Sequence, residues 1–299
     1  MRLAAKERRA YWVAELSKLS GSFGVDASRM AEELRSELER EGHEALFDHL
    51  RLCGSMPEQY GHDSSAEKLY SKYTDVILSE SLNAMGLHST VITTRGDAAD
   101  VQARAREFSL VADAKAFRLS RTAKNQKDFK VQAIDNWRGG LDYAIVVCPV
   151  FQLPSRVSQI YQQAIARNVC ILSYCHFAVM VGLADRRGAS LAEAALLDVL
   201  RSVSLLNPSK SAVDYWVAVN GALLRCLGDD ADLWTREKTA SMEGLLVVKE
   251  ESLRYLRLEL DRLLGLSHRE ALDELIRKSG LESRIEMVER IRHGSLLEL

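Results

Sequence analysis

The sequence is poor in proline, has no long apolar run and carries no large excess of charge of either sign. Only 4 prolines and 17 glycines occur in 299 residues, which favours long helices and argues against low-complexity linkers. No apolar run is long enough to cross a bilayer, so we expect no membrane partner. A formal net charge of −2 excludes a protein coated in Lys and Arg, but it leaves room for a local basic groove.

The five cysteines show no redox or metal-binding spacing. No C-x-x-C pair occurs, and Cys148, Cys170 and Cys175 lie in apolar surroundings, where a cysteine behaves as a small hydrophobe. Residues 1–15 mix charges of both signs and contain no apolar core of a signal peptide. We therefore expect a reduced, cytoplasmic protein.

The common nucleotide and zinc signatures are missing as well. The chain contains neither G-x-x-x-x-G-K-[ST] nor G-x-G-x-x-G, so no nucleotide cofactor is expected. His43-Glu44 begins like a zinc-protease motif, but Phe47 stands where the second histidine is required. The chemistry must therefore come from another set of residues.

Hydrophobic periodicity divides the chain into helical ends and a strand-rich centre. We expect an N-terminal helical region (1–63), an α/β core (64–180) and a C-terminal helical region (181–299), together forming one compact unit. Strands are predicted at 89–94, 100–103, 108–117, 141–148 and 169–173. Helices are predicted at 4–19, 26–41, 44–53, 66–85, 128–137, 155–167, 191–206, 212–227, 244–264 and 282–292, with Gly42 ending the second. Because strands alternate with helices in the centre, we expect a mixed sheet with helices on its faces.

Asp113-Ala114-Lys115 follows an apolar run and carries the first chemical signal. In a strand, Asp113 and Lys115 point to the same face. Asp100 lies thirteen positions earlier, just after a predicted turn at 95–97. A hairpin between the two strands places Asp100 beside Asp113.

Such a set suits phosphodiester hydrolysis. Carboxylates of Asp100 and Asp113, with the backbone carbonyl of Ala114, are the hard oxygen ligands that Mg²⁺ prefers. Mg²⁺ neutralises developing charge and lowers the pKa of a bound water. Lys115 is placed to orient that water and to stabilise the transition state. The alternative is that this tripeptide is a chance group of exposed charges.

Glu80 is a further candidate acid on the predicted helix 66–85. It lies on an apolar stripe, four positions after Val76 and three after Ile77. A carboxylate that faces a core needs a partner, and a metal cluster supplies one. The alternative is that Glu80 pairs with an arginine or lies at the edge of the stripe.

The segment after Lys115 is basic and rich in amides. Its cations and amides suit phosphate contacts together with the reading of base edges. The alternative is a solvated basic loop. The candidate DNA contacts are Arg118, Arg121, Lys124, Asn125, Gln126 and Lys127.

Residues 111–131, from Val-Ala-Asp-Ala-Lys-Ala-Phe-Arg to Asp-Phe-Lys-Val, resemble the catalytic stretch of the HindIII family of type II restriction endonucleases, within the PD-(D/E)XK superfamily. The turn at 95–101 and the C-terminus at 291–299 are also similar, and the strong resemblance covers 64–180. In this motif Asp100 takes the place of the first acid, Asp113 of the second and Lys115 of the lysine. Ala99 replaces the proline of the motif, and Asp97 competes for the first acid.

The resemblance implies a restriction-endonuclease-like fold and a homodimer that binds double-stranded DNA and uses Mg²⁺. It implies cleavage of the palindrome AAGCTT after the first A of each strand, leaving 5′-phosphates and four-base 5′ overhangs. Two alternatives stay open: a structure-specific repair nuclease, and a non-catalytic DNA-binding or scaffold protein whose acids form ion pairs. Mg²⁺-dependent fragments from a long duplex separate the first hypothesis from the last.

Overall fold

A five-stranded mixed sheet forms the centre of the fold. The computed structural model describes residues 1–92, 98–121 and 126–290. The strands lie in chain order, with antiparallel pairing among the first three and parallel pairing among the last three. They are β1 (His88–Val91), β2 (Val101–Arg104), β3 (Ser109–Ala114), β4 (Tyr143–Cys148) and β5 (Val169–Ser173). The predicted mixed sheet is thus confirmed.

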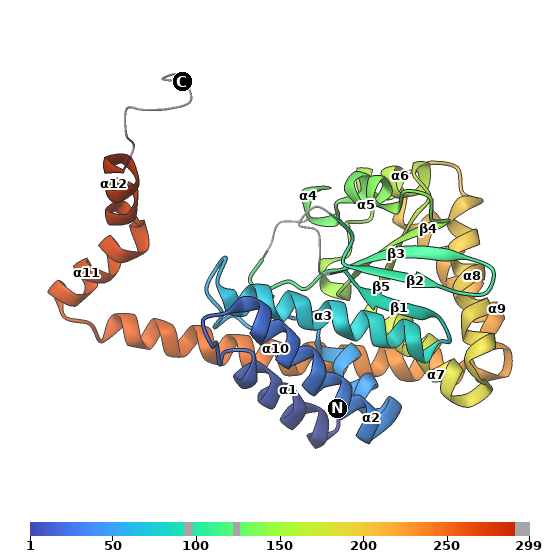
Figure 1. Ribbon diagram of the computed structural model, residues 1–299, viewed down its shortest axis with the longest axis horizontal. Coiled ribbons are helices and arrows are strands. Elements are labelled where there is room, and N and C mark those ends of the chain that lie inside the picture. Colours follow the sequence, from blue (N-terminus) through green and yellow to red (C-terminus); the bar gives the residue numbers. More distant parts are fainter. Residues whose placement is uncertain (93–97, 122–125, 291–299) are drawn as a thin grey trace. The chain divides into compact units, whose positions relative to one another are not determined.

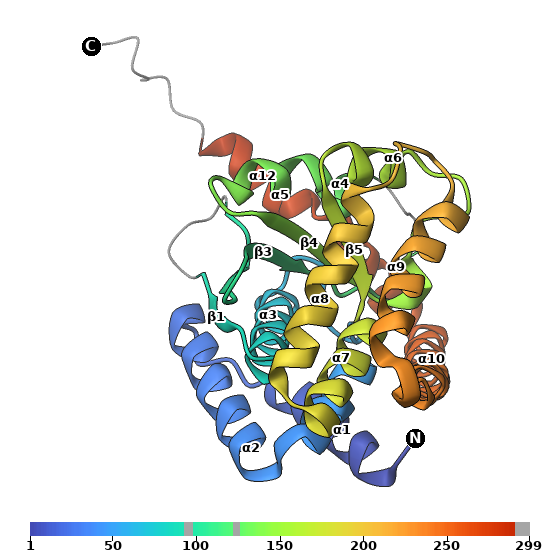
Figure 2. The same cartoon turned by 90° about the vertical axis from the view of Figure 1, so that its right-hand side faces the viewer.

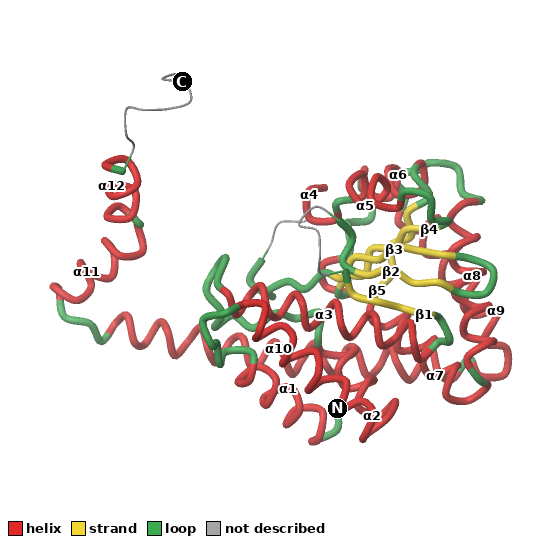
Figure 3. The backbone as a smooth tube through the Cα atoms, in the orientation of Figure 1, coloured by secondary structure: helices red, strands yellow, loops and turns green. Residues whose placement is uncertain are grey.

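The central strands are buried on both faces. Every residue of β5 and all but the first of β4 and β3 are buried. Near-continuous apolar runs such as Ala144–Cys148 are typical of parallel strands covered on both sides by helices. Figure 3 shows these strands as a layer between helices.

Helices cover the two faces of this sheet (Figures 1 and 2). On one face α5 (Val131–Arg138) packs against β3, β4 and β5, and α6 (Gln159–Ala166) packs against β5. On the other face α3 (Ser65–Ala84) packs against β1, β2 and β3, and α7 (Tyr174–Arg187) packs against α3. Two short elements, α4 (Gln126–Phe129) and the 3₁₀ helix η1 (Val150–Gln152), lie in the connections.

The N-terminal helices are α1 (Leu3–Glu15) and α2 (Phe23–Leu52), and α2 packs against α3 and α7. At Gly42 the backbone of α2 is non-helical, with φ 65° and ψ −153°. Glycine adopts a positive φ at little steric cost. The predicted break at Gly42 is therefore confirmed as a sharp bend between two helical halves.

The C-terminal region begins with a helical pair and ends in a long helix. α8 packs against α7 and α9. These elements are α8 (Ala189–Ser204), α9 (Ala212–Leu227), the 3₁₀ helix η2 (Gly228–Asp230) and α10 (Asp232–Leu264). The prediction that the last of them begins at residue 244 is wrong, because α10 begins twelve residues earlier.

Gly244 lies inside α10 for a packing reason. A Cβ at this position would come within 2.8 Å of the carbonyl oxygen of Arg51 at the end of α2. Seven residues to either side, two carboxylates form bidentate pairs: Glu237 with Arg51 (2.9 Å and 2.9 Å) and Glu251 with Arg9 (2.7 Å and 3.1 Å). The glycine thus allows close approach of α10 to the N-terminal helices.

The chain divides into two compact units, Met1–Ser252 and Leu253–Leu299. The second contains the end of α10, then α11 (His268–Ser279) and α12 (Leu281–Glu289), whose residues are not buried. Arg262 and Arg277 both pair with Glu274 inside this unit. The predicted division at 63/64 and 180/181 stays a prediction. Within the described ranges, no helix has the length and apolar character needed to cross a membrane.

Candidate active site

The β2–β3 hairpin brings the two predicted acids together. The register pairs Val101 with Ala112, so Asp100 and Asp113 stand opposite each other one position beyond. Their carboxyl groups share a hydrogen bond. The backbone carbonyl of Asp100 also accepts a 2.8 Å hydrogen bond from the amide of Ile92, which continues the pairing with β1. The rival acid Asp97 lies outside the described residues.

Asp113 is buried, and one of its two carboxylate oxygens has no hydrogen bond. Its residue exposure is 1%, and its Oδ2 atom accepts no hydrogen bond of good geometry in the described structure. The ammonium of Lys115 forms an ion pair with this same oxygen. A buried carboxylate oxygen with an open coordination position is costly, and a bound cation would satisfy it.

The two acids have opposite pKa shifts because they share one environment. Burial raises the pKa of Asp113 to about 7, Lys115 opposes this rise, and Asp100 adds to it. Burial also acts on Asp100, but its hydrogen bond with Asp113 and the nearby Lys72 and Lys115 hold its pKa below the ordinary value. The pair therefore titrates as a unit, with the proton on Asp113.

The backbone of Lys115 is held by hydrogen bonds on both sides. Its amide donates to the carbonyl of Val147 on β4 at 2.8 Å, and its carbonyl accepts from the Tyr174 hydroxyl on α7 at 3.0 Å. Ala114, whose carbonyl is the predicted third ligand, is the last residue of β3. The parallel partner strand and α7 thus hold the backbone that carries both predicted groups.

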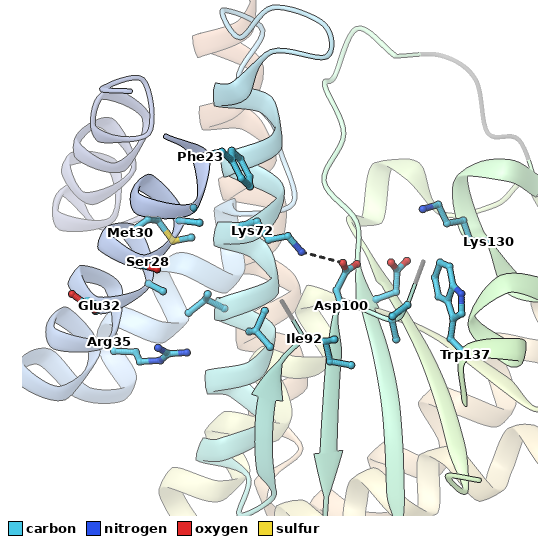
Figure 4. Close-up of a pocket in the computed structure, with 18 residues that line it drawn as sticks. Phe23, Ser28, Met30, Glu32, Arg35, Lys72, Ile92, Asp100, Lys130 and Trp137 are labelled. Carbon is cyan, nitrogen blue, oxygen red and sulfur yellow. Dashed lines mark hydrogen bonds and ion pairs between the residues drawn. The ribbon is translucent and has the colours of Figure 1, made fainter. Parts of the chain in front are cut away.

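Two residues of α3 that periodicity did not single out lie at this site. The Lys72 ammonium donates to Asp75 at 2.9 Å. It also donates to Asp100 at 3.3 Å (Figure 4). Burial, reinforced by Asp100 and Asp113, raises the pKa of Asp75 well above its usual range. The sequence signal that could have identified Asp75 is a carboxylate three residues after a lysine and directly before the apolar run Val76–Leu78.

A cavity of about 780 Å³ opens onto the acids. Its walls come from the first half of α2, from α3, from the segment before β2, and from Lys130 and Trp137 (Figure 4). Lys130 adopts a left-handed backbone conformation (φ 46°, ψ 32°), and its ammonium lies 5.5 Å from the centre of the Trp137 ring. A bulky residue in this region carries backbone strain, which often accompanies a functional site.

The structure does not bring Glu80 to this group. Its carboxylate accepts from Arg35 at 3.0 Å and from Asn83 at 3.1 Å, which agrees with the alternative of an arginine partner. No contact tests its role at a metal, which stays a prediction.

Two of the predicted DNA contacts have partners within the protein. Arg118 donates to Glu67 at 2.9 Å and to the carbonyl of Tyr60 at 2.7 Å. Arg121 pairs with Asp128 and is 44% exposed. Lys127 is exposed, whereas Lys124, Asn125 and the side chain of Gln126 lie outside the described residues.

A second group of possible ligands lies before and within the first turns of α3. His62, Asp63 and Glu67 bring ligand atoms within 4.8 Å of one another. Asp63 and His62 are exposed, and Glu67 is already engaged by Arg118 and by the amide of Asp63. This group has no buried, unsatisfied atom, so the Asp100–Asp113 pair is the better fit for a divalent ion.

The arrangement suits a hard divalent cation. Two carboxylates and a nearby backbone carbonyl form an all-oxygen donor set, and Mg²⁺ completes such partial sets with water and phosphate oxygens. The Oδ2 atom of Asp113, which has no hydrogen bond of good geometry and pairs with the Lys115 ammonium, is one of these oxygens. Lys115 and Lys130 add positive charge where a phosphate would enter, so the residues present fit hydrolysis of a phosphodiester.

Comparison with known proteins agrees with this chemistry. The model of the family described as HindIII restriction endonuclease matches residues 9–292. The chain is also similar to the type II restriction enzyme HindIII of Haemophilus influenzae (strain ATCC 51907 / DSM 11121 / KW20 / Rd). The two are 45% identical over 140 residues, which are 46% of this chain and 47% of that enzyme. This match therefore spans about half the length of the curated relative.

Proposed function

The chain belongs to the HindIII restriction endonuclease family, and on this premise we propose that it is a type II site-specific deoxyribonuclease dependent on Mg²⁺. One observation carries the proposal: the Asp113 carboxyl group is buried beside that of Asp100, and the Lys115 ammonium pairs with its Oδ2 atom. Two carboxylates this close repel each other. A divalent ion bound between them would remove that repulsion.

In the proposed mechanism Asp100, Asp113 and the carbonyl of Ala114 hold Mg²⁺. When bound, the ion neutralises charge on the scissile phosphate and lowers the pKa of water. Lys115, anchored through its backbone to β4 and α7, has its ammonium beside Asp113, where it would orient the attacking water. Burial of Asp113 keeps bulk water from its carboxylate, which strengthens the electrostatic interactions at the site.

The cavity beside these acids is the proposed path of the cleaved strand. Lys130 lies on the cavity wall and is suited to bind a backbone phosphate. Its ammonium also lies close to the ring of Trp137. Lys127 and the exposed Arg121 are proposed to bind neighbouring phosphates, with Lys124, Asn125 and Gln126 reaching the bases. Base reading by amides and cations would give the site preference.

The proposed substrate is the palindrome AAGCTT in double-stranded DNA, cut after the first A of each strand to leave 5′-phosphates and four-base 5′ overhangs. A palindrome presents the same scissile bond twice, and a twofold homodimer places one active centre at each. The 45% identical relative, itself named a type II restriction enzyme, supports this choice. The five cysteines, which form no disulfide in the described structure, agree with action in the reducing cytoplasm.

Cleavage tests the catalytic assignment. Purified wild-type protein is expected to convert a long duplex to discrete fragments with Mg²⁺ and to leave it intact with EDTA. Asp113→Asn should bind the duplex and not cut it, because it lacks the charged ligand. Asp198→Asn, which removes an exposed carboxylate from α8, is the matched control and should cut normally. Cutting by Asp113→Asn at the wild-type rate would refute the assignment.

Sequencing the fragment ends tests the specificity. Ends that begin with 5′-phosphorylated AGCTT in every fragment support the proposed palindrome. Ends at another fixed sequence leave the nuclease assignment standing and overturn the site. Uncut duplex together with cleavage of branched or flapped DNA would favour a repair nuclease instead.

A further inference from the structure

Lys72 occupies a position that the proposed mechanism does not use. Its ammonium lies between two carboxylates, 2.9 Å from Oδ2 of Asp75 and 3.3 Å from Oδ1 of Asp100. Asp75 is 2% exposed and Asp100 is a proposed metal ligand. Lys72 therefore binds an oxygen of Asp100, the carboxylate that would also bind a divalent ion.

The charges around the acids explain why a cation stands there. Asp75, Asp100 and Asp113 form an acidic cluster, and the described cations in contact with it are Lys72 and Lys115. Carboxylates this close repel one another unless a cation lies among them. Asp75 is too deeply buried to exchange partners with solvent, so it keeps Lys72 at the site.

Lys72 also faces the cavity in which the cleaved strand is proposed to lie (Figure 4). Its side chain is 30% exposed, so an incoming phosphate can reach the ammonium. A phosphate and a divalent ion act on this lysine in the same direction. The phosphate attracts the ammonium, and the ion takes its place at Asp100.

We propose that Lys72, held by Asp75, is a positioning residue that acts as an internal counter-ion: it competes with the divalent ion for Asp100 in the free protein and turns to a phosphate when DNA enters. This inference rests on the proposed function, because it takes Asp100 as a metal ligand and the cavity as the DNA path. The metal site is then weak in free protein and strengthens on DNA. By linkage, metal strengthens DNA binding by the same factor.

Two measurements on the purified full-length protein test the competition, neither of which requires cleavage. The first is Ca²⁺ affinity by calorimetry without DNA, since Ca²⁺ takes the same hard oxygen ligands. Lys72→Met should bind Ca²⁺ at least about tenfold more tightly than wild type, because a unit positive charge beside the ion is removed. Lys72→Arg keeps the charge and should restore the weak affinity.

The second measurement is affinity for a fluorescent duplex containing AAGCTT, by anisotropy in EDTA. Lys72→Met should bind this duplex several-fold more weakly than wild type, because the acids then face the phosphates without their counter-ion. Lys68→Met removes an exposed lysine one turn earlier on α3 and is the matched control for both measurements. It should change each affinity by less than about twofold.

Opposite changes in the two affinities are the signature of the proposal, because a damaged fold would weaken both. Equal Ca²⁺ affinity in Lys72→Met and Lys68→Met, or weaker binding of both ligands by Lys72→Met, would overturn it. Asp113→Asn separates this outcome from failure of the proposed function. If Asp113→Asn binds Ca²⁺ as wild type does, the metal site itself is misplaced. If it loses Ca²⁺ while Lys72→Met behaves as Lys68→Met, the competition alone fails.

Discussion

Asp113→Asn is expected to stabilise the metal-free protein while it abolishes cleavage. Asp113 is buried, its Oδ2 atom lacks a hydrogen bond, and burial raises its pKa to about 7. The charged carboxylate therefore destabilises the fold at neutral and alkaline pH. Asparagine has the same shape, carries no charge and can still hydrogen-bond Asp100.

The pKa values set the size and the pH window of this effect. A carboxyl group whose pKa rises from 3.8 to about 7 on folding contributes its full stability below pH 3.8 and loses it as the pH rises to 7. At about 1.4 kcal/mol per pH unit, the interval corresponds to roughly 4 kcal/mol. The lowered pKa of Asp100 offsets part of this loss, so we expect a gain of about 2–4 kcal/mol for Asp113→Asn at pH 8.

Urea unfolding in EDTA at pH 8 and pH 5 measures the gain. It should be largest at pH 8 and fall by about half at pH 5, where much of the wild-type Asp113 is already protonated. Asp142→Asn is a control in which stability should change in the opposite direction. Hydrogen bonds from Ser109 lower the pKa of Asp142, so removing this carboxylate should destabilise the protein. A variant no more stable than wild type at pH 8, or a gain independent of pH, would refute the argument.

Two further predictions concern His176 and the basic residues. Burial lowers the pKa of His176 to about 4, so the free energy of unfolding should fall by up to about 3 kcal/mol between pH 6.5 and 4. Thermal unfolding of His176→Gln should depend less on pH than that of wild type. The same pH dependence in both proteins would contradict a lowered pKa of His176. Lys130→Met should reduce the salt dependence of DNA binding, measured by anisotropy, by about one unit of slope per active centre. Arg118→Met should instead lower the melting temperature and leave that slope unchanged, because its partners are Glu67 and the Tyr60 carbonyl.

The centre of the fold was predictable because burial there follows simple patterns. Continuous apolar runs marked β4 and β5, and the thirteen-position spacing of Asp100 and Asp113 agreed with a hairpin of β2 and β3 that places them opposite each other. The resemblance of residues 111–131 to the HindIII family is confirmed by the family match. Local sequence was enough because each of these features depends on neighbours in the chain or on one tight turn.

The remaining site residues were not predicted from the sequence, because their partners are distant in the chain. Periodicity on α3 singled out Glu80, but the middle of that helix is buried almost all round, so a stripe argument does not choose among its acids. Asp75 and Lys72 acquire a role only when β2 brings Asp100 to them. Arg118 likewise finds Glu67 more than fifty residues away.

The docking of α10 has a consequence for how the protein tolerates insertions and deletions. Glu237, Gly244 and Glu251 are spaced by seven residues, so all three lie on nearly the same side of the helix. One added or removed residue between Glu237 and Glu251 would turn one end by about 100° relative to the other. Arg51 or Arg9 would then lose its carboxylate, and a side chain would meet the carbonyl of Arg51. Homologous chains should vary in length beyond Ser252 and keep a constant length within this span.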